Sequence, residues 1–334
     1  MSAPKYLVDA RDVSKRFSQE PDLAQKVAGL LGARTKRIVV HALDHVSLGI
    51  AEGEVVGLVG ESGSGKSTLG RIIAGIWEPS EGEIHFAGRP RNELNDTQRR
   101  AADLAVQMVF QDPMSSLNPR MHVAEIIGEA PEYHGIVKAS ETAAYVADIM
   151  QKVGLDPSFA ERYPHQFSGG QRARIGIARA LAVKPRVIVA DEAIAALDVS
   201  IQAQVINLFM KLRADLGLAY LFISHDLGVV RHLADRVAIL YLGRIVESAP
   251  ADELFNTPNH PYTVALLANM PKVETGKHAF APLEGEIPSP INPPSGCHFH
   301  PRCAHAMPRC AEVAPKLREV APGRLSACHL NDGA

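Results

Sequence analysis

The chain has 334 residues, with 35 Lys plus Arg against 37 Asp plus Glu and a net charge of -2. This length allows one large domain and a smaller extension, and the balanced charge leaves no overall basic field to hold nucleic acid. The sequence has no run of about 18 apolar residues, and Met1–Arg16 lacks an apolar stretch of signal-peptide type. We therefore expect a cytosolic protein that neither spans a membrane nor is exported and whose thiols stay reduced.

The stretch "EVVGLVGESGSGKSTLGRIIAGI", from Glu54, reads as an apolar strand, a glycine-rich loop and an amphipathic helix. Its loop fits the pattern G-x-x-x-x-G-K-S/T, in which backbone N–H groups cradle phosphates at a helix N-terminus. Lys66 would reach the β and γ phosphates, and Ser67 would ligate Mg²⁺. The alternative is a glycine turn with a solvated lysine, which the strand and helix context disfavours. The predicted nucleotide-binding residues are Gly60, Ser62, Gly63, Ser64, Gly65, Lys66, Ser67 and Thr68.

Three further apolar runs, "AVQMVFQD", "RVIVADE" and "AYLFISHD", each end in polar residues. Such runs are typical of parallel strands buried on both faces, and ligands bind beyond the carboxyl ends of these strands. One such polar residue could be an ordinary satisfied core group, but the repetition predicts a site beside the phosphate loop. We expect Asp191 to hold Mg²⁺ through water, Gln111 to sense the metal and the attacking water, Glu192 to be the general base, and His225 to contact the γ-phosphate.

A second helix start suited to an anion lies in "FSGGQRARIGIARALAV". There Ser168, Gly169, Gly170 and Gln171 open a helix with apolar spacing. One chain cannot bring both helix starts to the same nucleotide if they lie in separate layers. Two chains arranged head to tail could bring one helix start from each chain to the same nucleotide.

Together these motifs resemble the ATP-binding cassette (ABC) superfamily. The resemblance implies an α/β P-loop NTPase fold with an inserted helical subdomain, and it makes Gln111 the Q-loop residue and His225 the H-loop residue. It also implies that the signature at Phe167–Gln171 acts on a partner chain's nucleotide, beside a D-loop at Ala196–Asp198. Phe17, in "VSKRFS", is similar to the aromatic residue that stacks on adenine, although an ordinary core aromatic is the alternative.

The motifs "QDPMSSLNPRM", "YPHQFSGGQRARIGIARAL", "ALDVSIQAQV" and "HPYTVALL" resemble ATP-binding subunits of oligopeptide and dipeptide importers. The ends of the signature, Phe167 and Gln171–Arg172, favour the F type of these subunits. The resemblance implies a Mg²⁺-dependent ATPase that pairs with a D-type ATPase below two transmembrane permease subunits, peripherally on the cytoplasmic face of the inner membrane. An extracytoplasmic substrate-binding protein would deliver the cargo. The alternatives are an importer of nickel, glutathione, opines or sugars, and a soluble non-transport ABC ATPase.

One stretch departs from the family pattern. "DEAIAALD" carries Ala193 and Ala195 where the family usually has proline and then serine or threonine. Loss of the proline loosens the turn after Glu192, and loss of the hydroxyl removes a possible hydrogen bond across the interface, worth about 1 kcal/mol. We expect a tuned active site, and the alternative is a regulatory subunit that binds nucleotide without hydrolysing it.

Composition divides the chain near residue 250, because 13 of the 23 prolines fall from Pro250 onwards. We expect a nucleotide domain at 1–250, with the helical subdomain at about 113–182, and a loop-rich C-terminal extension at 251–334. An insertion between Phe17 and His45 has an apolar helical face at residues 23–31, followed by basic residues at 34–37. A short helix that packs on its own domain is the favoured interpretation, over contact with a permease or membrane.

The extension holds every cysteine, three of them in "PPSGCHFHPRCAHAMPRC". The residues alone leave three possibilities: an iron–sulfur cluster, a structural zinc, and four free thiols. Zinc sites more often use tight cysteine pairs, and none exists here, although His298, His300, His305 and His329 could stand in as ligands. The stretch resembles peptide-importer ATPases that hold a 4Fe–4S cluster, which implies a cluster here, with zinc as the alternative. We expect its role to be structural and separate from ATP binding, because the cysteines lie far in sequence from the phosphate loop and ATP hydrolysis needs no electron transfer. The implied ligands are Cys297, Cys303, Cys310 and Cys328.

Overall fold

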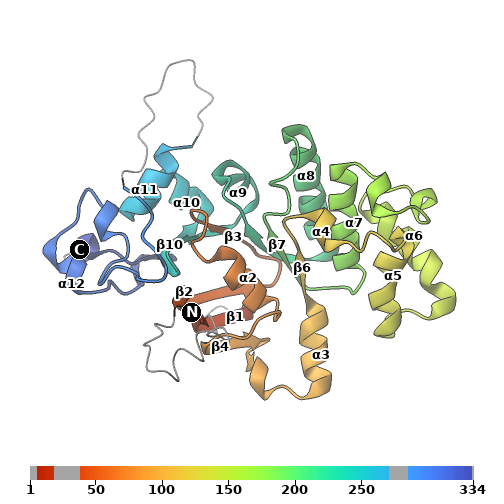
Figure 1. Ribbon diagram of the computed structural model, residues 1–334, viewed down its shortest axis with the longest axis horizontal. Coiled ribbons are helices and arrows are strands. Elements are labelled where there is room, and N and C mark those ends of the chain that lie inside the picture. Colours follow the sequence, from red (N-terminus) through yellow and green to blue (C-terminus); the bar gives the residue numbers. More distant parts are fainter. Residues whose placement is uncertain (1–5, 19–37, 271–284, 333–334) are drawn as a thin grey trace, which may run out of the picture.

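The computed structural model describes residues 6–18, 38–270 and 285–332 (Figure 1). The insertion at residues 19–37, with its expected helix and basic loop, lies outside the described residues. Within the described ranges, no helix has the length and apolar character that a membrane span requires.

The strands are β1 (Tyr6–Ser18), β2 (Val39–Ala51), β3 (Val55–Val59), β4 (Glu81–Phe86), β5 (Arg89–Pro90), β6 (Val106–Val109), β7 (Val187–Asp191), β8 (Ala219–Ile223), β9 (Arg236–Tyr241), β10 (Arg244–Pro250), β11 (Arg318–Ala321) and β12 (Arg324–Ser326). The α-helices are α2 (Lys66–Ile73), α3 (Asp96–Ala105), α4 (Pro113–Ser116), α5 (Val123–Tyr133), α6 (Thr142–Lys152), α7 (Gly169–Leu181), α8 (Val199–Leu216), α9 (Leu227–Leu233), α10 (Ala251–Asn256), α11 (Pro261–Ala268) and α12 (Pro308–Glu312). The short 3₁₀ helices are η1 (Arg91–Glu93), η2 (Ala139–Glu141), η3 (Pro157–Phe159), η4 (Pro164–Gln166), η5 (His300–Arg302) and η6 (His329–Asn331).

The main sheet has eight strands in the order β11-β12-β10-β9-β3-β8-β7-β6. Its neighbours from β9 to β6 are parallel, whereas β10, β12 and β11 pair antiparallel at the other edge. A smaller antiparallel sheet has the order β2-β1-β4-β5. The predicted α/β fold with a parallel core sheet is confirmed, and β3, which leads into the phosphate loop, lies inside the sheet between β8 and β9.

Strand β3 is buried along its whole length, and its alternating side chains face two layers. Val56 and Leu58 pack in one cluster with Leu69 of α2 and with the small sheet. Val55 and Val59 belong to the opposite cluster, which contains buried residues of α7 and α8. Each such side chain contributes about 1.5–3 kcal/mol on burial, so the two layers hold α2 firmly at the end of β3.

Four helices, α4 to α7, occupy the chain between β6 and β7 and gather at one end of the molecule (Figure 1). Ile127 of α5 and Val146 and Met150 of α6 are buried in the same cluster as the helical face of the main sheet. This packing makes the inserted helices continuous with the sheet that carries the site.

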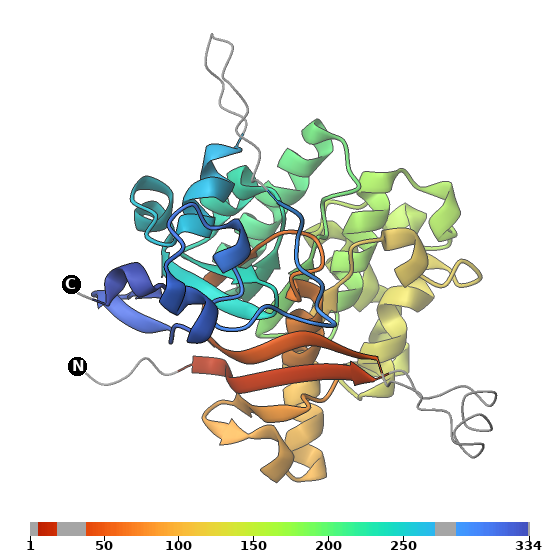
Figure 2. The same ribbon diagram turned by 60° about the vertical axis from the view of Figure 1, so that its left-hand side comes forward.

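The C-terminal extension shares the main sheet. Strand β12 pairs with β10 through Glu247 and Ser326, and β11 pairs with β12, so the extension adds two strands to the sheet edge. Phe299 packs on Tyr241 and Tyr262, with ring centroids 5.3 Å from each. A short proline-rich segment buries too little apolar area alone, and it folds by joining the larger core. Figure 2 shows the blue extension lying against the main body.

A buried carboxylate also ties the extension to β10. Glu247 is 1% exposed, and its two oxygens accept the backbone N–H groups of Asn259 and His260, each at 2.8 Å. These two residues directly precede α11, so one side chain sets where that helix begins.

We expect Glu247→Ala to lower the free energy of unfolding by about 2–4 kcal/mol, because two buried N–H groups lose their acceptors. Thermal or urea unfolding measures the change. The control is Glu253→Ala, at a half-exposed carboxylate of α10, which should change stability by about 1 kcal/mol or less. Equal losses for the two variants would contradict this role for Glu247.

Candidate nucleotide-binding site

The phosphate loop follows β3 and leads directly into α2. Gly65, its last residue before the helix, has φ of 107°, and a Cβ atom there would lie 2.4 Å from the carbonyl oxygen of Ala42. Only glycine combines that backbone conformation with that close approach. The loop therefore closes tightly against β2, and its backbone is shaped for an anion at the start of α2.

Lys66 lies under this loop and is 5% exposed. Its Nζ donates to the carbonyl oxygens of Gly60 and Glu61, at 2.8 and 2.9 Å. Burial lowers the pKa of Lys66, and the nearby carboxylates of Glu192 and Asp191 oppose that shift. The ammonium group thus rests on its own loop, where phosphate oxygens would replace the carbonyls.

The predicted polar residues meet at the carboxyl edge of the sheet. Ser67 Oγ donates to Asp191 Oδ1 at 2.8 Å, and Gln111 Nε2 donates to Glu192 Oε2 at 2.8 Å. His225 Nδ1 lies 3.4 Å from Glu192 Oε1. Burial raises the pKa of Asp191, although the Ser67 hydroxyl partly offsets this. One set joins Ser67 to Asp191, a second joins Gln111 and His225 to Glu192, and the two sets adjoin because Asp191 and Glu192 are consecutive in the chain.

A cavity of about 260 Å³ joins the loop to these polar residues. Val40, Ala42 and Pro290 also line it, although their apolar side chains belong to no recognisable sequence motif. Val40 and Ala42 lie in β2, and Pro290 lies in the extension. Phe17 pairs with Val40 across β1 and β2 but does not itself line the cavity; it is 36% exposed and meets Trp77 edge-on at 5.2 Å. The residues lining the cavity are Val40, Ala42, Ser62, Gly63, Gly65, Lys66, Ser67, Thr68, Gln111, Glu192 and Pro290.

The second predicted anion site lies elsewhere on the chain. Ser168 is the N-cap of α7, where its side chain accepts the N–H of Gln171. In both views α7 belongs to the helices beyond β7, apart from α2 (Figures 1 and 2). Asp198, the N-cap of α8, is exposed, and Val199 beside it is 82% exposed. The described chain thus presents its signature and D-loop away from its own phosphate loop.

Hydrogen bonds hold the turn after Glu192 despite the missing proline. The Glu192 N–H donates to the Ile223 carbonyl, and the Ala195 N–H donates to the Glu192 carbonyl, both at 3.0 Å. Glu192 has φ of 47°, a left-handed conformation that costs a non-glycine residue about 1–3 kcal/mol. Strain of this kind is concentrated at functional sites, which agrees with a catalytic position.

The C-terminal extension reaches the phosphate loop directly. The Tyr262 hydroxyl oxygen accepts the Glu61 N–H at 3.0 Å, and Arg302 pairs with the Glu61 carboxylate at 2.7 and 3.0 Å. The extension, which we expected to be separate from ATP binding, therefore contacts the phosphate loop. Long-range packing brings together residues that are more than 200 positions apart in sequence.

The four cysteines form no disulfide and lie in one region of the extension. The Cys297 N–H donates to the Cys310 carbonyl at 2.7 Å, and burial, with the other three cysteines nearby, raises the pKa of Cys297 to about 11. Burial also raises the pKa of Cys303 and of Cys328. Both ring nitrogens of His329 are already bonded, to Asp332 and to the Val313 carbonyl, so His329 is not a spare zinc ligand. Over the described residues, no group of three or more His, Cys, Asp or Glu side chains has an arrangement that could hold a metal ion.

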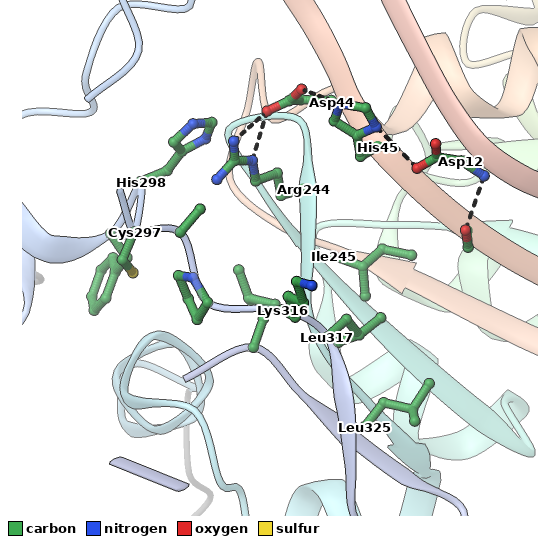
Figure 3. A pocket seen from close by; sticks show the side chains of 16 residues that line it. Asp12, Asp44, His45, Arg244, Ile245, Cys297, His298, Lys316, Leu317 and Leu325 are labelled. Carbon is green, nitrogen blue, oxygen red and sulfur yellow. Dashed lines mark hydrogen bonds and ion pairs between the residues drawn. The ribbon is translucent and has the colours of Figure 1, made fainter. Parts of the chain in front are cut away.

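A larger cavity, of about 660 Å³, lies between β2, β10 and the extension (Figure 3). The pairs Asp44–Arg244 and Asp12–His45 lie along one side, and Ile245 and other apolar residues lie along the other. None of its described lining residues belongs to the phosphate loop. The smaller cavity therefore remains the candidate site, because the chemically matched groups converge there.

Comparison with known proteins agrees with this geometry. The family described as "ABC transporter" matches residues 43–195, and "Oligopeptide/dipeptide transporter, C-terminal region" matches residues 246–310. The oligopeptide transport ATP-binding protein AppF of Bacillus subtilis is 48% identical over 97% of each chain. The oligopeptide transport ATP-binding protein OppF of Escherichia coli is 49% identical over 78% of this chain and 80% of its own. The chain belongs to the ABC transporter ATP-binding proteins of the oligopeptide and dipeptide family.

Solved ABC cassettes share the fold. A dimer of the ATP-binding cassette MJ0796, in a post-hydrolysis state with ADP and Pi, is 29% identical, with a TM-score of 0.61, over 73% of this chain and 98% of that one. A second dimeric structure of MJ0796, a bacterial ABC transporter cassette, has a TM-score of 0.62 at 28% identity, with the same coverage. These cassettes cover 73% of this ABC protein, and the oligopeptide/dipeptide C-terminal region matches residues 246–310 of it.

We expect Lys66→Ala to weaken ATP binding by at least about tenfold, because the cavity loses its buried cation. Equilibrium titration of the full chain with a fluorescent ATP analogue measures this. The control is Lys152→Ala, at a half-exposed lysine that pairs with Asp148 on α6, and it should leave the affinity unchanged. If Lys66→Ala binds ATP with parental affinity, the assignment of this cavity as the nucleotide site is wrong.

Proposed function

We propose that this chain binds ATP with Mg²⁺ and hydrolyses it as the ATPase subunit of an importer of oligopeptides or dipeptides. The observation that supports this most directly is that two adjoining sets of polar contacts, Ser67 with Asp191 and Glu192 with Gln111 and His225, meet beside the phosphate loop. The peptide cargo rests on relatives named for oligopeptide and dipeptide transport. Cargo is selected by other subunits, so importers of nickel, glutathione, opines or sugars remain the alternative class.

In the proposed mechanism, Lys66 exchanges its bonds to the loop carbonyls for bonds to the β and γ phosphates. Ser67 and Asp191 supply oxygen atoms at the Mg²⁺ position, since they already lie 2.8 Å apart and hard cations prefer oxygen ligands. Bound Mg²⁺ neutralises phosphate charge. Glu192 accepts a proton from the attacking water, Gln111 orients that water and the metal site, and His225 contacts the γ-phosphate.

The proposed active unit is a head-to-tail dimer. In it, Ser168, Gly169, Gly170, Gln171 and Asp198 act on the nucleotide of the partner chain. Support comes from the exposed D-loop and from the dimeric cassette structures. We assign the chain to the F type and its partner to the D type, with Phe17 stacking on adenine. The dimer would lie under two permease subunits on the cytoplasmic face of the inner membrane, supplied by an extracytoplasmic binding protein.

In the extension, we propose that Cys297, Cys303, Cys310 and Cys328 hold a 4Fe–4S cluster. The four thiols match the number of ligands in a Cys₄ cluster, and the other three cysteines lie near enough to Cys297 to raise its pKa. Binding of the cluster would require these side chains to draw together, since in the described residues they do not yet form a metal-holding group. The bonded state of His329 counts against the zinc alternative. The cluster would be structural, joining segments of the 251–334 extension that have little core of their own, beside the 1–250 nucleotide domain with its helical subdomain at 113–182.

The first test of function is Glu192→Gln. Loss of the general base should cut ATP hydrolysis by about 10²- to 10⁴-fold while ATP binding stays intact. It should also trap a closed dimer, which size-exclusion chromatography with ATP detects. Phosphate release by the chain with its partner ATPase measures the rate.

The matched control is Glu129→Gln, at an exposed position of α5, which should hydrolyse ATP at the parental rate. A parental rate in Glu192→Gln would overturn the assignment of the base. If the parent protein binds ATP but releases no phosphate, the chain is instead a regulatory subunit, as the departures at Ala193 and Ala195 would allow.

The second test concerns the metal. Protein purified without air should be brown and contain about four irons per chain, and Cys303→Ala should lose that iron. Elemental analysis of both proteins measures this, with Arg309→Ala as a control beside Cys310 that keeps all four thiols. Colourless protein that contains one zinc would reject the cluster.

A further inference from the structure

The phosphate loop contains a carboxylate where an anionic ligand must bind. Glu61 is the one acidic residue in the loop sequence "GESGSGKS". Burial lowers the pKa of Lys66, the residue that we propose binds the phosphates, and the negative charge of Glu61 opposes that shift. An unpaired carboxylate at this position would repel ATP, because like charges in a partly buried site are weakly screened.

Arg302 neutralises this carboxylate. Its guanidinium makes two parallel bonds to Glu61, from Nη1 to Oε2 at 2.7 Å and from Nη2 to Oε1 at 3.0 Å. The Arg302 side chain is 3% exposed and also donates to the Tyr241 hydroxyl at 3.4 Å. A bidentate pair fixes orientation as well as charge, and the Glu61 carboxylate held on Arg302 does not line the cavity at the loop.

Tyr262 holds the backbone of the same residue. Its hydroxyl accepts the Glu61 N–H at 3.0 Å, while the Glu61 carbonyl accepts from Lys66 Nζ. Tyr262 has no exposed surface and packs on Tyr241 with ring centroids 4.6 Å apart. Both contacts to Glu61 thus come from the extension through one rigid aromatic cluster.

We propose that Arg302 and Tyr262 of the C-terminal extension are positioning residues for the phosphate loop, which set its affinity for the polyphosphate of ATP by pairing Glu61. This inference rests on the proposed ATPase function. It makes the extension a part of the nucleotide site. Because Arg302 directly precedes Cys303, it also connects the cysteines to ATP binding.

The test is a charge-rescue series in the full chain, read by equilibrium ATP binding and by KM and kcat for hydrolysis with the partner ATPase. Arg302→Met should raise Kd and KM for ATP about tenfold with little change in kcat at saturating ATP, because Glu61 is left unpaired. The double variant Glu61→Gln with Arg302→Met should return Kd to within about threefold of the parent, because the repelling charge is gone. Tyr262→Phe, which keeps the ring, should raise Kd a few-fold.

The control is Arg318→Met, which breaks an extension ion pair with Asp332 and should leave Kd and KM at parental values. The inference is wrong if Arg302→Met binds ATP as the parent does, or if the double variant binds no better than Arg302→Met. If Arg302→Met does not fold, two other variants replace it in the test. Arg302→Lys should bind ATP nearly as the parent does, and Tyr262→Phe should bind it more weakly. Parental affinity in Tyr262→Phe overturns the inference. A parent protein that binds no ATP would instead refute the proposed function.

Discussion

The burial of Lys66 among carbonyl oxygens and carboxylates constrains the architecture around it. A cation that is 5% exposed needs fixed partners, and Gly60, Glu61, Asp191 and Glu192 supply them. Those partners stay in place because β3 and β7 are buried on both faces, with helices on one side and the small sheet on the other. The two apolar layers therefore fix the strands whose ends surround the Lys66 ammonium group.

The same sheet separates the two helix starts suited to an anion. Ser168 and Asp198 are the N-caps of α7 and α8, and Figure 1 shows these helices apart from α2. Buried residues of α7 and α8 belong to one core cluster and those of α2 to the cluster on the other face of the main sheet. A second chain is the arrangement that uses both helix starts, and dimeric relatives of this fold exist.

Strand pairing at β10, the buried Glu247 and the contacts to Glu61 all join the extension to the cassette. A loop-rich segment with little core gains stability by such sharing. Through Arg302 and Tyr262, the extension contacts the phosphate loop itself. The proposed role of these two residues in ATP binding would couple the two parts of the chain.

The sequence by itself determined the elements whose signal is local. The phosphate loop, the apolar strands that end at Gln111, Asp191 and His225, and the capping pattern at Ser168 depend on neighbouring residues, and such patterns can be read directly. It also predicted that four strand ends would meet, because parallel strands share an edge.

Only the tertiary structure decided which distant residues touch. The pairing of Arg302 with Glu61 across 241 positions, the lining of the cavity by Val40 and Pro290, and the addition of β11 and β12 to the main sheet leave no local pattern. Such contacts depend on how whole layers pack, and an arginine or a proline in a loop reads the same whether or not it meets a partner.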